Sequence, residues 1–135
     1  MTAGYSGTPL DRKLGIKPAH TVALLGAPEG FVGETLALPD GVRLRRRAGG
    51  TADVIVSFHT RRADLARRLP ALRAMMAPAA GLWIAWPKQS ARMATDMTEN
   101  AVREIALPTG LVDNKVCAID ATWSGLRLVI RLRDR

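Results

Sequence analysis

The side chains that could perform catalysis or bind a metal are few and lie far apart in this sequence. The chain has two histidines, His20 and His59, and a single cysteine, Cys117. Two distant imidazoles and one thiol do not have the spacing of a metal site, so no metal is expected. Cys117 stands between Val116 and Ala118 in a strand-like run, which favours a buried, inert thiol over a nucleophile. No Ser–His–Asp order or Gly-x-Ser-x-Gly turn indicates a serine nucleophile.

His59 has the position most typical of a ligand-binding residue. It ends the strand-like run Asp53–His59, and α/β proteins bind ligands at the carboxyl ends of their central strands. The alternative, which we favour, is a loop histidine held by backbone hydrogen bonds. His20 opens the first predicted strand, so the two histidines should lie at opposite ends of the sheet and should not meet.

A second group of polar and aromatic residues follows the predicted strands and the last helix. In the expected topology the loops that carry them converge near one edge of the ligand cleft. The group consists of Trp86, Lys88, Thr95, Asp96, Asp113, Asn114, Lys115 and Trp123. We favour a structural interpretation, in which Lys88 pairs with Asp96 or Asp113 and the two tryptophans cover the hydrophobic floor.

The basic residues are concentrated in one segment. The net charge is +8, and nine of the sixteen arginines lie between Arg43 and Arg73, where the only acids are Asp53 and Asp64. Arginine presents planar donors that suit phosphate and carboxylate groups. The candidates for an anion-binding or partner-binding face are Arg45, Arg46, Arg47, Arg61, Arg62, Arg67 and Arg68. The expected partner is nucleic acid or an acidic protein surface, and the plain alternative is a solvated face that reflects the arginine bias of a GC-rich genome.

Length and composition place these residues in one small domain. A chain of 135 residues buries enough apolar surface to fold without disulfides. The single cysteine is typical of a reducing compartment. No segment has the pattern of a signal peptide or the ~20 apolar residues of a membrane span. We therefore expect a cytoplasmic protein that does not enter a membrane.

The chain is predicted to have two parts, an N-terminal arm and one α/β domain. Residues 1–19 are rich in turn residues and form the arm, with a short helix at Leu10–Leu14. Residues 20–135 form the domain. Its buried parallel strands are predicted from short apolar runs at Thr21–Leu25, Asp53–His59 and Leu82–Trp86.

The remaining elements follow from periodicity and turn residues. Val42–Arg45 alternates apolar and basic residues and predicts a half-exposed strand at or near an edge. One helical stripe is formed by Leu65, Leu69, Leu72 and Met76. Pro70 should kink that helix or start a second one, and Thr98 should cap a later helix. With a hairpin at Lys115–Arg131 and its turn at 121–125, the pattern predicts a Rossmann-like, mostly parallel α/β sheet with a C-terminal antiparallel hairpin.

Two family resemblances extend this prediction. The stretch Leu69–Ile84 resembles the fourth helix, the Pro-Gly-Gly-type turn and the fifth strand of the class I methyltransferase fold, although Ala79 and Ala80 stand before Gly81 in the turn. This resemblance implies a shortened version of that fold. The whole chain resembles a small bacterial domain-of-unknown-function family, which implies no particular activity. The matching segments are Tyr5–Leu10, Lys13–Ile16, Gly26–Phe31, Trp83–Lys88 and Gly110–Ala118.

The methyltransferase resemblance does not extend to the positions that bind a cofactor. A site for S-adenosylmethionine needs a glycine-rich turn after the first strand and an acid at the end of the second. Here the turn is Gly26–Gly30, in which Pro28 removes a backbone donor, and Arg45–Arg47 stand in place of the acid. The same departures disfavour NAD, so no cofactor is expected. Gly26 and Glu29 remain candidates for lining a ligand cleft.

These observations favour a binding function over catalysis. The leading hypothesis is a non-catalytic binding or regulatory module on a degenerate methyltransferase-like fold, with the arginine-rich face for an anionic partner. The alternative is an enzyme or binder of a phosphorylated or nucleotide-like small molecule at the carboxyl ends of the strands. The two hypotheses share an anion but place it differently, on an extended face or in a cleft.

Overall fold

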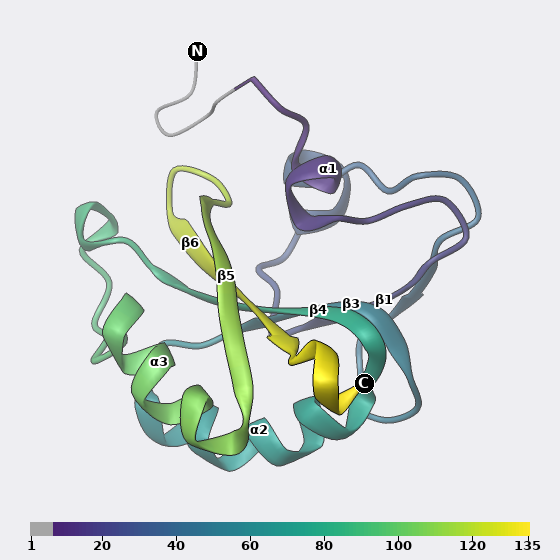
Figure 1. Cartoon of the computed structure of the whole chain (residues 1–135). Coiled ribbons are helices and arrows are strands. Elements are labelled where there is room, and N and C mark those ends of the chain that lie inside the picture. Colours follow the sequence, from purple (N-terminus) through teal and green to yellow (C-terminus); the bar gives the residue numbers. More distant parts are fainter. Residues whose placement is uncertain (1–6) are drawn as a thin grey trace.

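The computed structural model describes residues 7–135, which form one sheet with helices on both of its faces (Figure 1). Residues 1–6, which include Tyr5 and Ser6 of the family resemblance, lie outside the described residues. The strands are β1 (Thr21–Leu25), β2 (Arg43–Arg45), β3 (Ala52–Phe58), β4 (Met76–Pro87), β5 (Leu111–Ala118) and β6 (Trp123–Ile130). The helices are α1 (Leu10–Leu14), α2 (Arg62–Met75) and α3 (Glu99–Ala106), with short 3₁₀ turns at Gln89–Ala91, Leu107–Thr109 and Leu132–Asp134.

The sheet combines a parallel core with an antiparallel hairpin. Its strand order is β2-β1-β3-β4-β6-β5. The first four strands in this order are parallel, with Val22 opposite Val54 and Ile55 opposite Leu82. β6 runs antiparallel between β4 and β5. The predicted fold class is therefore confirmed, as are the edge position of the strand at Val42–Arg45 and the hairpin at the other edge.

The hairpin turn lies earlier in the chain than the sequence pattern indicates. The carboxylate of Asp120 accepts hydrogen bonds from the backbone N–H groups of Thr122 and Trp123, each at 2.8 Å. This side-chain turn reverses the chain before Trp123, which already pairs with β4. The expected turn at 121–125 is therefore wrong, because an aspartate shapes the reversal and Gly125 is a strand residue.

Helix α2 passes directly into β4. The apolar periodicity places Met76 at the end of the helical stripe, but Met76 is the first residue of β4 and pairs with Ala52. Met75 takes its place on the buried side of the helix. Pro70 lies inside one continuous helix, so no second helix starts there. Proline removes one backbone hydrogen bond, and burial of the leucine stripe offsets that loss.

Helix α3 begins where the sequence predicts it. The Thr98 hydroxyl accepts a hydrogen bond from the backbone N–H of Ala101 at 3.0 Å, which confirms the N-cap. The apolar face of the helix buries Val102 and Ala106 against the sheet. No helix formed by residues 7–135 has the length and apolar content of a transmembrane segment.

The two faces of the sheet are covered unequally (Figure 1). Helices α2 and α3 cover one face, where Leu82, Ile84 and Trp86 of β4 are buried. The other face is covered by the five-residue α1 and by the irregular turn Phe31–Thr35, which pack over Trp83. A short helix and a turn therefore take the place of a full helical layer on this second face.

One buried hydrogen bond fastens α1 to the sheet. The indole N–H of Trp83 donates to the backbone carbonyl of Leu14 at 3.0 Å, and both side chains are fully buried. Leu10 and Ile16 pack into the same cluster. The predicted N-terminal arm therefore contributes to the core from Leu10 onward.

Replacing Leu14 by alanine should lower the free energy of unfolding by about 2–5 kcal/mol, because it opens a cavity over Trp83. Leu132→Ala is the matched control, since Leu132 is 80% exposed and its loss should change stability by less than about 0.5 kcal/mol. Urea unfolding followed by tryptophan fluorescence measures both. Equal stability of the two variants would show that α1 does not support the sheet.

Candidate functional site

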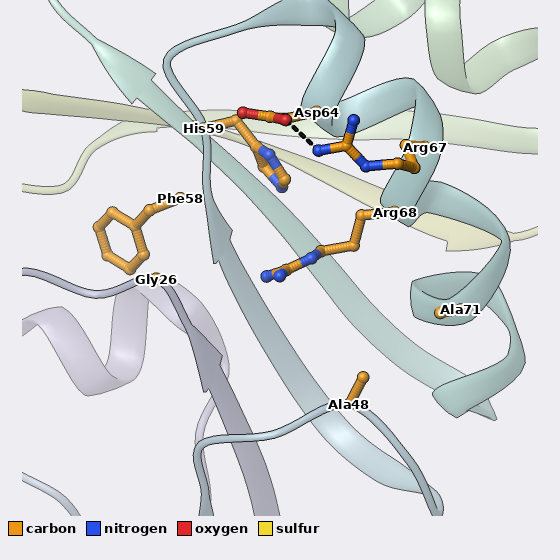
Figure 2. A pocket seen from close by; sticks show the side chains of 8 residues that line it. All are labelled: Gly26, Ala48, Phe58, His59, Asp64, Arg67, Arg68 and Ala71. Carbon is orange, nitrogen blue, oxygen red and sulfur yellow. Dashed lines mark hydrogen bonds and ion pairs between the residues drawn. The ribbon is translucent and has the colours of Figure 1, made fainter.

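A cleft of about 480 Å³ opens at the carboxyl ends of β1 and β3. It is lined by Gly26, Ala48, Phe58, His59, Asp64, Arg67, Arg68 and Ala71 (Figure 2). The chain leaves β1 toward β2 on one side and then returns to β3 on the other side of β1. This reversal of direction is the point at which open α/β sheets bind ligands. The cleft therefore occupies the position expected of a ligand site in this fold.

The floor of the cleft depends on a close approach between two strand ends. Gly26 has φ of +73°, and a Cβ atom at this position would lie 3.2 Å from the Phe58 carbonyl oxygen. Glycine therefore lets the loop after β1 lie against the end of β3. The Phe58 ring packs edge-on against Phe31 and Trp123, with centroids 5.1 Å apart in each pair. Phe58 is thus held by the core and offers little ring surface for stacking on a base.

His59 is neutral, and both its ring and its backbone are fixed by hydrogen bonds. Its Nε2 atom lies 2.7 Å from the Ser57 hydroxyl, and its backbone N–H donates to the carbonyl of Ala85 at 2.9 Å. Burial lowers its pKa from 6.5 to about 4, and the nearby Arg68 adds to this effect while Asp64 opposes it. An imidazole that stays neutral at pH 7 brings no positive charge to the cleft.

The positive charge of the cleft comes from α2. Arg67 forms an ion pair with Asp64 one turn earlier. Arg68 makes no hydrogen bond or ion pair with any residue in 7–135, and its guanidinium extends from α2 across the cleft (Figure 2). Ala48 lines the opposite wall and follows the exposed Arg46 and Arg47. The structure therefore brings the helix that carries Arg67 and Arg68 close to the loop residue that follows Arg47.

The other candidate arginines serve partly structural roles. Arg45 donates to the Gly49 carbonyl at 2.6 Å. Arg62 donates to the Asp96 carbonyl at 3.2 Å and pairs with Glu104 at 3.5 Å. Arg61 is exposed and makes no such contact with the described part of the chain. Arg46, Arg47, Arg61 and Arg68 are therefore the candidate arginines that remain available to an external anion.

The second predicted cluster does not assemble, so its expected convergence is wrong. Asp113 lies opposite Leu128 and pairs with Arg103 at 3.0 Å, far along β5 from the carboxyl end of β4. Asp96 accepts a hydrogen bond from the backbone N–H of Arg62 at 2.8 Å. Within residues 7–135 neither acid pairs with Lys88, contrary to the favoured interpretation. The reason is that β4 and β5 both pair antiparallel with β6 and so run in the same direction. β5 therefore begins at the opposite end of the sheet from the carboxyl end of β4.

The remaining members of that cluster are also separated. Trp86 and Trp123 belong to the cores on opposite faces of the sheet, so they do not share a floor. Lys88 and Trp86 line a separate cavity of about 460 Å³ beside the start of α3. Lys115 lies on β5 and donates to the Lys13 carbonyl at 3.3 Å. Glu29 is exposed and does not line the cleft beside Gly26.

Some lining residues could not be identified from the sequence. Ala48, Phe58 and Ala71 carry no chemical signal, and their place in the cleft follows from strand order alone. Asp64 had a signal, since it stands three residues before Arg67 in a predicted helix.

Cys117 is half-buried, and burial raises the pKa of its thiol, so it is protonated at neutral pH. No three metal-binding side chains lie together within residues 7–135.

Solved structures, several of them of methyltransferases, have a similar fold. A SAM dependent methyltransferase from Aquifex aeolicus aligns with a TM-score of 0.60 at 18% identity, over 89% of this chain and 87% of that chain. Magnesium protoporphyrin IX methyltransferase from Synechocystis with bound SAH aligns with a TM-score of 0.58 at 13% identity, over 84% of this chain and 75% of that chain. A fibrillarin pre-rRNA processing protein from Methanococcus jannaschii aligns with a TM-score of 0.58 at 12% identity, over 89% of this chain and 73% of that chain.

These alignments establish a class I methyltransferase-like fold, and at such low sequence identity they establish nothing further. No protein-family model and no curated protein matches the sequence. The resemblance to the bacterial domain-of-unknown-function family therefore stays a prediction.

The residues at the cleft do not fit S-adenosylmethionine. The loop after β1 contains Pro28 and leads into the turn Phe31–Thr35, in which Val32 and Gly33 have non-helical angles. In the described structure, therefore, no helix N-terminus follows β1 to hold the carboxylate of the cofactor. β2 ends at Arg45, so the position where a ribose-binding acid is required carries positive charge instead.

Titration calorimetry with S-adenosylmethionine should accordingly show no binding tighter than about 1 mM. The methyltransferase with bound cofactor from Synechocystis is the positive control. Micromolar affinity would contradict this interpretation of the β1 loop and restore a catalytic one.

Lowering the pH should destabilise the fold through His59. The unfolded chain accepts a proton near pH 6.5, whereas folded His59 resists protonation until about pH 4. The contribution of His59 to the free energy of unfolding is therefore fully present above pH 6.5 and is lost as the pH drops toward 4. The loss is about 2 kcal/mol once the open cleft is allowed for. In His59→Gln this component is absent, so urea unfolding should show a shallower loss between pH 6.5 and 4. Identical slopes would mean that His59 is not desolvated.

Proposed function

We propose that this protein is a non-catalytic binding module for duplex nucleic acid, which it contacts through the arginines around the cleft. The observation that carries the proposal is Arg68, which extends across the cleft and has no partner among residues 7–135. Arg46 and Arg47 are exposed and directly precede Ala48, which lines the same cleft. A guanidinium in an open cleft, with two more exposed arginines in the adjoining loop, suits the phosphates of a nucleic acid backbone.

The state of the other polar groups supports binding over catalysis. His59 is neutral and its ring is hydrogen-bonded to the Ser57 hydroxyl, so it is poorly placed to serve as a general base. Asp64 is occupied by Arg67. Among the described residues, the cleft therefore presents a charged donor but no free acid, base or nucleophile.

The aromatic residues support a duplex over a single strand. Proteins that bind single strands stack bases on exposed rings. Phe58 is the aromatic residue of the cleft, and it is buried against Phe31 and Trp123. Contacts to the phosphate backbone need no such ring, and they are independent of sequence.

A small phosphorylated or nucleotide-like ligand is the second candidate. The volume of about 480 Å³ and the position at the crossover between β1 and β3 favour it. In this case Arg68 would meet the phosphate, and the exposed arginines outside the cleft would contribute little.

Fluorescence anisotropy with a labelled DNA duplex tests the proposal. Affinity should fall steeply with salt, and Arg46→Ala/Arg47→Ala/Arg68→Ala should flatten the log–log slope by up to ~2.7 units, at ~0.9 for each phosphate that is no longer neutralised. The control removes the same charge elsewhere, as Arg92→Ala/Arg131→Ala/Arg133→Ala, and should leave most of the slope. Circular dichroism verifies that both triple variants are folded.

The outcomes separate the two candidates. Absence of duplex binding at ~50 mM salt, where electrostatic contacts are strong, contradicts the nucleic-acid proposal. If AMP then binds with micromolar affinity and Arg68→Ala abolishes this binding, the small-ligand candidate is correct. Equal losses in the two triple variants would indicate charge attraction without a defined site.

A further inference from the structure

A second cationic site lies away from the cleft, on the face of the sheet that α1 covers. Lys115 of β5 and Arg127 of β6 stand directly opposite each other. Like charges at opposed positions of an antiparallel pair repel and destabilise the sheet. Arg12 and Lys13 of α1 border the same cavity, whose volume is about 220 Å³. Gly15 and Asn114 complete its lining, so no carboxylate of residues 7–135 lines it.

The guanidinium of Arg127 is half-buried and unmatched. It makes no hydrogen bond or ion pair with any residue in 7–135. Burial lowers its pKa, and the nearby Arg135 lowers it further. A partly desolvated charge without a partner is costly. Gly81 makes this placement sterically allowed, because a Cβ atom there would lie 2.6 Å from the Arg127 Nε atom.

Arg103 shows how this chain treats an arginine that serves structure alone. Its guanidinium pairs with Glu99 at 2.6 Å and with Asp113 at 3.0 Å. These two carboxylates raise its pKa, the reverse of what happens to Arg127. Arg127 thus lacks, within residues 7–135, the carboxylate partners that Arg103 has.

A β-bulge builds the site. The register between β5 and β6 shifts between Asp113 and Lys115. In a regular strand these two side chains would share a face. The extra residue, Asn114, lets Asp113 face Arg103 of α3 while Lys115 reaches back to Lys13 of α1. The bulge thus turns Asp113 away from the cavity and delivers a lysine to it.

We infer that the cavity between α1 and the β5–β6 hairpin binds a phosphate group, with Arg127 and Lys115 as its principal ligands. Guanidinium and ammonium donors from two strands suit a tetrahedral oxyanion. At about 220 Å³ the cavity is too small for a nucleotide. A neighbouring cavity of about 310 Å³ shares Arg12, Lys13 and Lys115 and continues along β5 to Cys117, so it has room for the organic part of a phosphomonoester. The site is independent of the function proposed for the cleft.

The test measures stability in sodium phosphate against sodium chloride of equal ionic strength, which keeps screening constant. At a phosphate concentration ten times the dissociation constant, the folding equilibrium constant of the wild type should rise about tenfold. Arg127→Gln should lose this gain while being at least as stable as the wild type in chloride, because it removes an unpaired charge. The matched control, Arg133→Gln, carries the change on the exposed C-terminal turn and should keep the gain.

Amide chemical-shift mapping by NMR locates the bound ion. Titration with phosphate should move the amide signals of Gly15 and Asn114 in the wild type but not in Arg127→Gln. Gly81→Ala should weaken the response, because the added methyl group displaces the Arg127 side chain. Glycerol 3-phosphate is compared with inorganic phosphate. Tighter binding of the ester identifies a phosphomonoester as the ligand, and equal binding identifies free phosphate.

Several outcomes would overturn the inference. One is the absence of any phosphate-specific gain in stability, and another is an equal gain in Arg127→Gln. A third is a set of shifted amides confined to Gly26 and His59, which would place the anion in the cleft. The cleft variant Arg68→Ala should bind phosphate at the second site normally, and Arg127→Gln should bind duplex DNA normally, so either proposal can fail without the other.

Discussion

Burial of β3 and β4 on both faces is the constraint on which the rest of the structure depends. Val56 of β3 and Trp83 of β4 face one core, whereas Ile55 and Ile84 face the other. A parallel sheet of this kind is stable only when both faces are covered. Helices α2 and α3 supply one cover in full. The other cover is short, and the buried hydrogen bond from Trp83 to Leu14 holds it in place.

The thin cover also determines where ligands can reach the protein. The loop after β1 forms an irregular turn in place of a helix, so the ends of β1 and β3 open into the cleft. α1 is only five residues long, so it leaves the middle of the hairpin accessible beside Arg127. Both candidate sites therefore lie beside the short elements that cover this face of the sheet.

The arginines divide into those that the protein satisfies and those that it does not. Arg62, Arg67 and Arg103 have carboxylates within the described structure, and exposed pairs of this kind contribute little to stability. Arg68 and Arg127 have none among residues 7–135. Their chemistry is identical, so the distinction lies in their surroundings. Composition gives the amount of positive charge, and packing decides which part of it is available to a partner.

Much of the fold was determined by local sequence. The apolar runs at Thr21–Leu25 and Asp53–His59 specify buried parallel strands, and Thr98 specifies the start of α3, because short-range patterns encode burial and capping. The turn at Asp120 was also local, but glycine and serine residues nearby gave a competing signal. The position of the cleft followed from strand order, which placed His59 at a carboxyl end as predicted.

Only the tertiary structure decided the state of the site residues. The bulge at Asn114 separates Asp113 from Lys115. Both lie far from Lys88, because β5 runs in the same direction as β4 and begins at the opposite end of the sheet. Desolvation makes His59 neutral, and this effect depends on neighbours from β3, α2 and the loop after β1. Register, burial and charge pairing all join residues that are distant in sequence. A single sequence therefore determines which groups are present, and the packed fold determines which of them can act.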